Sequence, residues 1–225
     1  MENKVVLITG TSSGFGYLTV KSTAKMGLTV YAGMRNIEGK NKPKADELTE
    51  FAKMNNLKIN PVEMDVTDEK SVDDAVKSIM STERTIDILI NNAGVSCGGW
   101  TEAFTAEQFY KVLDVNLMGV HRVNRTVLPF MRKQNSGLII YISSICGRMI
   151  IPFMGPYNAS KFAVEGLAES YSCELSGFGI KSVIIEPSVF QTNVGKNMLY
   201  SDDIERLNTF EDKLNEPEEF FNGFF

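Results

Sequence analysis

The chain reads Val5-Val6-Leu7-Ile8-Thr9-Gly10-Thr11-Ser12-Ser13-Gly14-Phe15-Gly16 near its start, and this stretch decides the fold. An apolar, β-branched run passes directly into three glycines spaced G-x-x-x-G-x-G, which predicts a buried strand, a tight turn and the start of a helix. Gly10 permits the turn, Gly14 lets backbone approach a pyrophosphate, and Gly16 allows close packing of helix on strand. The N–H groups and positive dipole of such a helix start attract phosphate. The stretch therefore predicts a dinucleotide-binding loop, with a purely structural glycine turn as the alternative.

The rest of the chain alternates short apolar runs with helical patterns. Besides residues 5–9, short apolar runs, most of them continuous, occur at 28–32, 57–64, 86–91, 138–143 and 180–186. Such runs are typical of strands buried on both faces of a parallel sheet. Between them, amphipathic patterns predict helices, for example over 44–55 and 157–176. The alternation predicts a single α/β domain with a doubly wound parallel sheet, the Rossmann fold, in which ligands bind at the carboxyl ends of the strands.

Composition and charge exclude several classes of protein. The 225 residues have a formal net charge of −5, but residues 201–225 alone carry −6 and the rest +1. A near-neutral body lacks the basic surface that nucleic-acid binding requires, so we expect no nucleic-acid partner. One histidine argues against a metal site, and three widely spaced cysteines are typical of reduced thiols. Because no apolar stretch is long enough for a membrane helix or a signal peptide, we expect a cytoplasmic protein without membrane contact.

The end of the second predicted strand bears on the choice of cofactor. NAD-binding proteins place a carboxylate about twenty residues after the glycine loop, where it holds the ribose 2′-hydroxyl. Here Met34 and Arg35 occupy that region, and no carboxylate follows until Glu38. Since an arginine pairs with a 2′-phosphate, the sequence favours NADP(H), with NAD(H) still possible. The alternative for Arg35 is a solvated surface position.

Two further strand ends carry candidate cofactor contacts. Asp65, followed by Val66, closes the third predicted strand and is placed to meet the adenine amino group, or alternatively to cap the next helix. The next strand ends in Asn91-Asn92-Ala93-Gly94, whose small residues allow backbone to lie close to adenine and ribose. Both segments belong to the edge of the sheet where a dinucleotide is expected.

A candidate reacting centre follows from residue spacing. Tyr157 and Lys161 are four positions apart at the start of the long predicted helix, so they project from one face. A Tyr and Lys at this spacing also arise by chance, and their placement therefore carries the argument. Ser144 ends the fifth predicted strand thirteen residues before Tyr157, and Asn116 lies in a helical stretch expected to flank the same crevice.

Together these residues resemble a classical short-chain dehydrogenase/reductase. The resemblance extends over residues 5–192, in family order and spacing, and rests on Thr9 to Gly16, Asp65-Val66, Asn91 to Gly94, Asn116, Ser144, Tyr157 to Lys161, Pro187 and Thr192. Residues 30–36 further resemble the steroid- and retinol-dehydrogenase-like branch, in which NADP is common. The resemblance implies an NADP(H)-dependent oxidoreductase that interconverts a carbonyl and a secondary alcohol.

The resemblance also implies a role for each residue of the reacting centre. Tyr157 is expected to act as general acid/base, with Lys161 lowering its pKa and holding the nicotinamide ribose. Ser144 is expected to hydrogen-bond the substrate oxygen, and Asn116 to hold a water that links Lys161 to solvent. The alternatives are ordinary structural roles: a helix cap, a solvated lysine, a strand end and a helix break.

The last cofactor contacts implied by the resemblance follow the sixth predicted strand. There Pro187, the backbone near Val189 and Thr192 are expected to meet the nicotinamide carboxamide, although Ser188 replaces the family's usual glycine. The full expected cofactor set is Gly10, Thr11, Ser12, Ser13, Gly14, Phe15, Gly16, Arg35, Asp65, Val66, Asn92, Ala93, Gly94, Tyr157, Lys161, Pro187, Val189 and Thr192. The substrate is expected to be small and apolar, because the candidate pocket residues are Cys97, Trp100, Met149, Phe153, Met154, Phe190 and Met198.

The C-terminal end departs from the family pattern. We expect residues 1–192 to form the dinucleotide-binding and catalytic unit and 193–225 only a partial substrate-covering extension, with one helix over 202–214 and no seventh strand. A shortened end of this kind predicts a six-stranded sheet whose last strand is an uncovered edge. A non-catalytic dinucleotide-binding or regulatory protein is the alternative function, and an extended-branch epimerase or dehydratase a more distant one. By resemblance we expect a homodimer or homotetramer.

Overall fold

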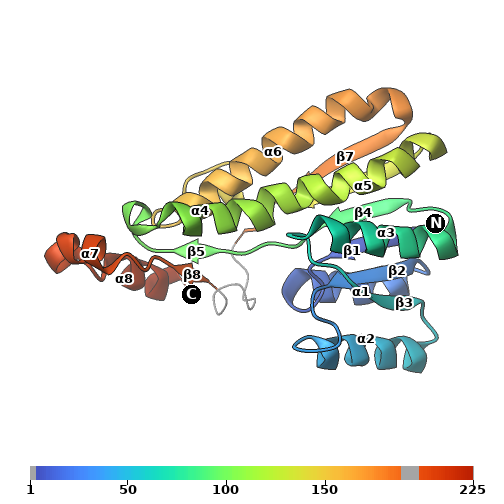
Figure 1. Ribbon diagram of the computed structural model, residues 1–225, viewed down its shortest axis with the longest axis horizontal. Helices are drawn as coiled ribbons and strands as arrows, with labels where there is room; N and C mark the ends of the chain where they lie inside the picture. The colour runs from blue at the N-terminus through green and yellow to red at the C-terminus, as the bar shows by residue number, and fades with distance from the viewer. Residues whose placement is uncertain (1–3, 189–197, 225) are drawn as a thin grey trace.

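Six parallel strands form the central sheet in the order β3-β2-β1-β4-β6-β7 (Figure 1). The computed structural model describes residues 4–188 and 198–224. The strands are β1 (Val5–Thr9), β2 (Thr29–Met34), β3 (Ile59–Glu63), β4 (Ile88–Asn91), β6 (Gly137–Ile142) and β7 (Ile180–Ile185). All six predicted strands are confirmed, as is the doubly wound α/β fold. The strand order reverses between β1 and β4, which places a crevice at the carboxyl edge of these two strands.

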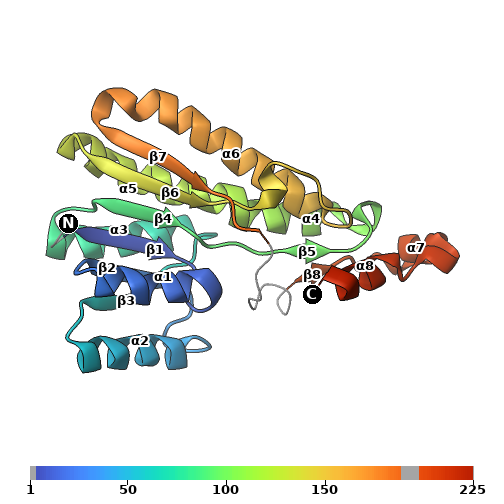
Figure 2. The same ribbon diagram turned by 180° about the vertical axis from the view of Figure 1, so that it is seen from behind.

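Helices cover both faces of the sheet (Figures 1 and 2). They are α1 (Gly14–Lys25), α2 (Lys42–Asn55), α3 (Glu69–Glu83), α4 (Ala106–Leu113), α5 (Gly119–Gln134) and α6 (Gly155–Leu175). Alternate residues of β1 explain the two layers: Val5 and Leu7 pack with α3, α5 and α6, whereas Val6 and Ile8 pack with α1 and α2. Each such buried side chain contributes about 1.5–3 kcal/mol, so the apolar run of β1 fixes the centre of the fold.

The half of the sheet formed by β6 and β7 is less covered on its α1/α2 side. Ile140 and Ile142 are only half-buried there, and Val183 and Ile185 are 42% and 45% exposed. β7 pairs with β6 alone and forms the edge of the sheet. The predicted six-stranded sheet with an open last strand is therefore confirmed for the described residues.

The C-terminal segment packs far from β7, at the end of the molecule near α4 (Figure 1). β8 (Leu199–Tyr200) pairs in parallel with the short strand β5 (Cys97–Gly98). The prediction of one helix over 202–214 is wrong: α7 (Ile204–Leu207) leads into 3₁₀ turns (Asn208–Lys213), and Glu211 breaks them with a positive φ of 50°. α8 (Glu216–Phe224) follows, and its early proline and acidic first turn favour a helix start.

Candidate active site

The glycine loop is packed too tightly for side chains at two positions. Gly10 has a φ of +69°, and a Cβ there would lie 2.6 Å from Ala93 Cα. A Cβ on Gly16 would overlap Asn92 Nδ2 and the Gly10 carbonyl oxygen. Asn92 Nδ2 donates to the carbonyls of Thr9 (2.8 Å) and Gly10 (3.0 Å), so it ties the end of β4 to the loop. The loop is thereby held rigidly at the carboxyl ends of β1 and β4.

Adding a single methyl group at Gly16 should damage this loop. We expect Gly16→Ala to lower the free energy of unfolding by about 1–3 kcal/mol, because the new Cβ overlaps its neighbours. Gly166→Ala is the matched control, since no atom lies within 4 Å of a Cβ there and the site is inside α6. That control should gain about 0.5–1 kcal/mol from helix propensity. Urea unfolding measures both, and equal effects of the two changes would contradict the tight packing.

The start of α1 lies at the crevice and has no capping side chain. Ser13 is the N-cap residue, but its side chain makes no capping hydrogen bond, and the first turn of α1 contains no acidic residue. Thr11, by contrast, is buried and donates from both its N–H and its hydroxyl to the Gly33 carbonyl (3.1 Å each). The arrangement therefore fits an anion in front of α1, with Thr11 holding the loop against β2.

One cavity of about 1420 Å³ runs along the carboxyl edge of the sheet from the glycine loop to Tyr157. From the predicted set it is lined by Gly10, Ser12, Ser13, Gly14, Phe15, Arg35, Asp65, Val66, Asn92, Ala93, Gly94, Ser144, Tyr157, Lys161 and Pro187. Thr11, Gly16 and Asn116 do not line it but support residues that do. Val189 and Thr192, like the candidate pocket residue Phe190, lie outside the described residues.

The end of this cavity beside β2 is basic. Arg35, Lys40 and Lys44 all line it. Arg35 makes no ion pair within the described ranges, whereas Lys44 donates to Glu47 at 2.8 Å. Glu63 lines the cavity as well, but its carboxylate accepts the N–H groups of Asn36 (2.7 Å) and Ile37 (2.8 Å). Arg35 was predicted from the sequence but the two lysines were not, because only the fold of the 35–44 segment brings them beside the strand end.

Asp65 does not cap the following helix. Its Oδ1 accepts the N–H and the hydroxyl of Thr67 (2.9 and 2.7 Å), whereas Asp68 is the N-cap of α3. The predicted alternative for Asp65 is therefore wrong. The side chain lines the cavity, and a contact with a base there stays a prediction.

Lys161 is buried and held in a fixed place. It is 6% exposed, and its Nζ donates to the Ile142 carbonyl at the end of β6 (2.8 Å). Nζ lies 5.6 Å from the centre of the Tyr157 ring. Burial lowers the pKa of Lys161 to about 8, with Cys146 and Glu165 acting in the opposite direction. This lysine therefore titrates close to physiological pH.

The pKa of Tyr157 is raised and not lowered. Burial raises it to about 12, and a hydrogen bond with the Ser144 side chain only partly opposes that effect. The expectation that Lys161 depresses it is wrong for the protein alone, since the ring is enclosed and the ammonium bonds to a backbone carbonyl. Tyr157 is thus held in its protonated form, ready to donate a proton.

Asn116 lies in a π-helical turn (Asp114–Met118) between α4 and α5, and it is 1% exposed. Its amide nitrogen donates to the Val95 carbonyl and to Ser160 Oγ, both at 2.9 Å, and its oxygen accepts the Val95 N–H at 2.8 Å. Both amide hydrogens are therefore used within the protein. The side chain joins the loop after β4 to α6, one residue before Lys161. A π-helical turn of this kind is frequent at functional sites.

The end of the cavity beside Tyr157 is apolar. Its walls there are Ile145, Cys146, Ile151, Met154, Met198, Phe220 and Phe221. Met154 and Met198 were predicted, whereas Phe220 and Phe221 were missed because α8 folds back over more than sixty residues to reach the site. Cys97, Trp100, Met149 and Phe153 do not line the cavity. Trp100 instead stacks on Phe210 (ring centres 4.4 Å apart) and meets Phe153 edge-on (5.0 Å).

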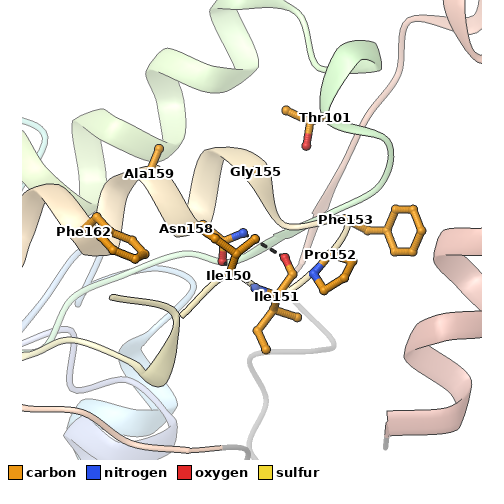
Figure 3. Close-up of a pocket in the computed structure, with 9 residues that line it drawn as sticks. All are labelled: Thr101, Ile150, Ile151, Pro152, Phe153, Gly155, Asn158, Ala159 and Phe162. Carbon is orange, nitrogen blue, oxygen red and sulfur yellow. Dashed lines mark hydrogen bonds between the residues drawn. The ribbon is translucent and has the colours of Figure 1, made fainter. Parts of the chain in front are cut away.

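The segment 150–153 also faces a second groove of about 430 Å³, and Ile151 lines both this groove and the main cavity (Figure 3). Asn158 Nδ2 donates to the Ile151 carbonyl at 2.8 Å, the dashed line in Figure 3, and this bond fixes the segment on the first turn of α6. Within residues 4–188 and 198–224 there is no group of three or more His, Cys, Asp or Glu that could hold a metal ion. In the same ranges no helix is both long and apolar enough to cross a membrane.

Comparisons with known proteins agree with this geometry. The family described as short chain dehydrogenase matches residues 4–202. A 3-ketodihydrosphingosine reductase from Bacteroides thetaiotaomicron is 40% identical over 197 residues, which cover 88% of this chain and 68% of that protein.

Two solved structures show the same likeness with different cofactors. A gluconate 5-dehydrogenase from Burkholderia cenocepacia, in complex with NADP and tartrate, gives a TM-score of 0.80 at 27% identity, over 87% of this chain and 75% of the other. A short chain dehydrogenase/reductase from Burkholderia phymatum, in complex with NAD, gives 0.81 at 27% identity, over 87% and 69%. The likeness therefore extends to NADP and NAD complexes alike.

Proposed function

Because the chain belongs to the short chain dehydrogenase family, an NAD(P)-dependent group of oxidoreductases that act on alcohols and carbonyls, we propose that it reduces an apolar ketone, reversibly, with NADP(H). The observation that carries the proposal is one cavity that joins the glycine loop to Tyr157, Ser144 and Lys161. A protein that only binds a dinucleotide would need no more than the part of that cavity beside the glycine loop. The other part holds the Tyr157 hydroxyl, the Ser144 hydroxyl and the Lys161 cation beside an apolar wall.

The residues present fit a dinucleotide. The glycine loop presents backbone at Gly10 and Gly16, where a Cβ would collide, and α1 begins without a capping side chain. When bound, the nicotinamide cofactor supplies or accepts the hydride. We propose that Gly10 to Gly16 hold the pyrophosphate, that Asp65, Val66 and Asn92 to Gly94 hold the adenosine half, and that Pro187, Val189 and Thr192 hold the carboxamide.

Proton transfer is assigned to Tyr157. Its raised pKa keeps the hydroxyl protonated, and the proton can pass to the oxygen of a ketone held by Ser144. Ser144 Oγ accepts the Cys146 N–H (3.2 Å) and hydrogen-bonds to Tyr157, and we propose that its hydroxyl turns to the substrate oxygen when a ketone is bound. In the reverse direction Tyr157 must act as the phenolate, which burial disfavours in the protein alone, and we propose that the cation on Lys161 offsets part of that cost. Asn116 supports this centre by fixing Ser160 beside Lys161.

The basic end of the cavity supports NADP(H). A 2′-phosphate adds nearly two negative charges, which Arg35, Lys40 and Lys44 can balance. The Glu63 carboxylate repels a 2′-phosphate less than a free carboxylate would, because it already accepts two backbone N–H groups. Solved relatives occur in complex with NADP and with NAD, so they do not decide between the two cofactors. The preference for NADP(H) is therefore inferred from these side chains.

The test is an activity screen. NADPH oxidation at 340 nm should be measured with a series of ketones that share the carbonyl and differ in apolar length. We expect kcat/KM to rise with apolar length, because the wall beside Tyr157 is apolar. Tight NADPH binding with no turnover of any ketone would contradict the proposal and favour a protein that only binds the dinucleotide.

A further inference from the structure

A buried carboxylate lies behind the reacting centre. Glu165 is 3% exposed and is the sole carboxylate buried to this degree in the described part of the chain. It follows Lys161 by one turn of α6, so both side chains project from the same face of the helix. A lone buried charge is costly, so its partners show what it does there.

The two carboxylate oxygens of Glu165 meet the segment that carries Ser144. Oε1 accepts the Ser143 hydroxyl at 2.7 Å, and Oε2 lies 2.7 Å from Arg148 Nε. Between these two contacts, Gly147 passes so close that a Cβ would overlap Oε1. Glu165 therefore holds Ser143 by a hydrogen bond and Arg148 by an ion pair alone, since Oε2 accepts no hydrogen bond in the described part of the chain, and Ser144 lies between these two contacts.

Arg148 extends this clamp to β7. Its Nε donates to Glu186 Oε1 at 2.8 Å, one residue before Pro187 of the cavity wall. The Pro187 carbonyl in turn accepts the Ile145 N–H at 3.0 Å. Arg148 is itself half-exposed, so it keeps a partner and solvent even without Glu165.

Glu165 also provides a carboxylate that can balance the positive charge of Lys161. The titratable groups that act on or face Lys161 are Tyr157 and Glu165 of α6 and Cys146 of the Ser144 turn. Tyr157 and Cys146 both have raised pKa values and are neutral near pH 7. Of these groups only Glu165 is a carboxylate, and its field opposes the effect of burial on the pKa of Lys161.

We propose that Glu165 is a positioning residue, which holds the Ser144 turn against α6 and balances the buried ammonium of Lys161. The inference rests on the proposed function, since it assigns Glu165 to the same reacting centre. This role accounts for a buried carboxylate on the face of α6 that also carries Tyr157 and Lys161.

The charge and the clamp are separable by substitution. Glu165→Gln keeps an oxygen that can accept the Ser143 hydroxyl but removes the charge, whereas Ser143→Ala removes one contact of the clamp and keeps the charge. Glu169→Gln is the matched control: Glu169 lies one turn further along α6, is 64% exposed, and meets Arg148 at 3.6 Å from the solvent side, with no hydrogen bond to Ser143.

Two readouts follow Lys161 in each variant. The first is the alkaline limb of the pH profile of kcat for ketone reduction. The second is a ¹³C NMR titration of lysine labelled at Cε, with the Lys161 signal assigned by its loss in Lys161→Met. For Glu165→Gln we expect both to move to lower pH by about one unit, which is about a tenfold loss of rate on that limb. Ser143→Ala should lower kcat without moving either, and Glu169→Gln should change neither.

The outcomes separate this inference from the proposed function. Lys161 titrating in Glu165→Gln as in the wild type would overturn the inference, whether or not the enzyme turns over a ketone. A wild type with no turnover would overturn the proposed function, while the NMR titration would still decide the inference. A shift of the same size in Glu169→Gln would also overturn it, because the effect would then not depend on burial.

Discussion

Replacing Tyr157 by Phe is expected to lower kcat for ketone reduction by about 10²–10⁴-fold, the usual range for losing a general acid. The change removes only the hydroxyl. The ring keeps its contacts with the buried clusters around Cys97 and Cys146, so the fold should be preserved. NADPH binding, followed by its fluorescence, should stay close to that of the wild type. The expected result is therefore a loss confined to the chemical step.

Tyr171→Phe is the matched control for this change. Tyr171 lies on the same helix, its hydroxyl is 3.3 Å from His121 Nδ1, and it does not line the cavity. We expect it to retain turnover. If the kcat of Tyr157→Phe stayed within about tenfold of the wild-type value, Tyr157 would not be the proton donor.

Replacing Arg35 by Asp is expected to reverse the cofactor preference. Hydrogen bonds to charged groups are worth about 1.5–3 kcal/mol, so losing the guanidinium and adding a negative charge should weaken NADPH binding by about 100-fold. The new carboxylate can accept the ribose 2′-hydroxyl, so NADH binding should strengthen. Isothermal titration with each cofactor measures the ratio of the two Kd values.

Lys58→Asp makes the same charge change at an exposed position. Lys58 lies just before β3, at the amino ends of the strands, whereas Arg35 lies at their carboxyl ends. This variant should leave that ratio unchanged. If Arg35→Asp also left the ratio of Kd values unchanged, Arg35 would not read the 2′-phosphate. Lys40→Ala and Lys44→Ala would then show whether the two lysines missed from sequence carry that preference instead.

The sheet and the phosphate loop were predictable because their determinants are local. A strand buried on both faces needs a continuous apolar run, and 5–9 is such a run that ends at a glycine. Tyr157 and Lys161 were predictable for the same reason, since helix geometry alone places them on one face. The positions of Gly10 and Gly16 likewise follow from a turn that leaves no space for a Cβ.

The features that sequence analysis missed depend on contacts between distant segments. Glu165 appears as an ordinary residue of an amphipathic helix until Ser143 and Arg148 are folded onto it. Phe220 and Phe221 reach the cavity only because α8 returns to the site. The pKa of Tyr157 was mispredicted because spacing gives the neighbouring lysine but not the depth of burial.

The most direct test of the central claim is to follow deuterium from NADPH into product. NADPH deuterated at C4 on either face should be supplied in turn with the best apolar ketone, and the alcohol analysed by mass spectrometry and NMR. The account predicts that one of the two cofactors gives an alcohol with a single deuterium on the carbinol carbon, and that Tyr157→Phe forms it at a rate lower by about 10²–10⁴-fold. An alcohol without deuterium from either cofactor, or one formed equally fast by Tyr157→Phe, would contradict it.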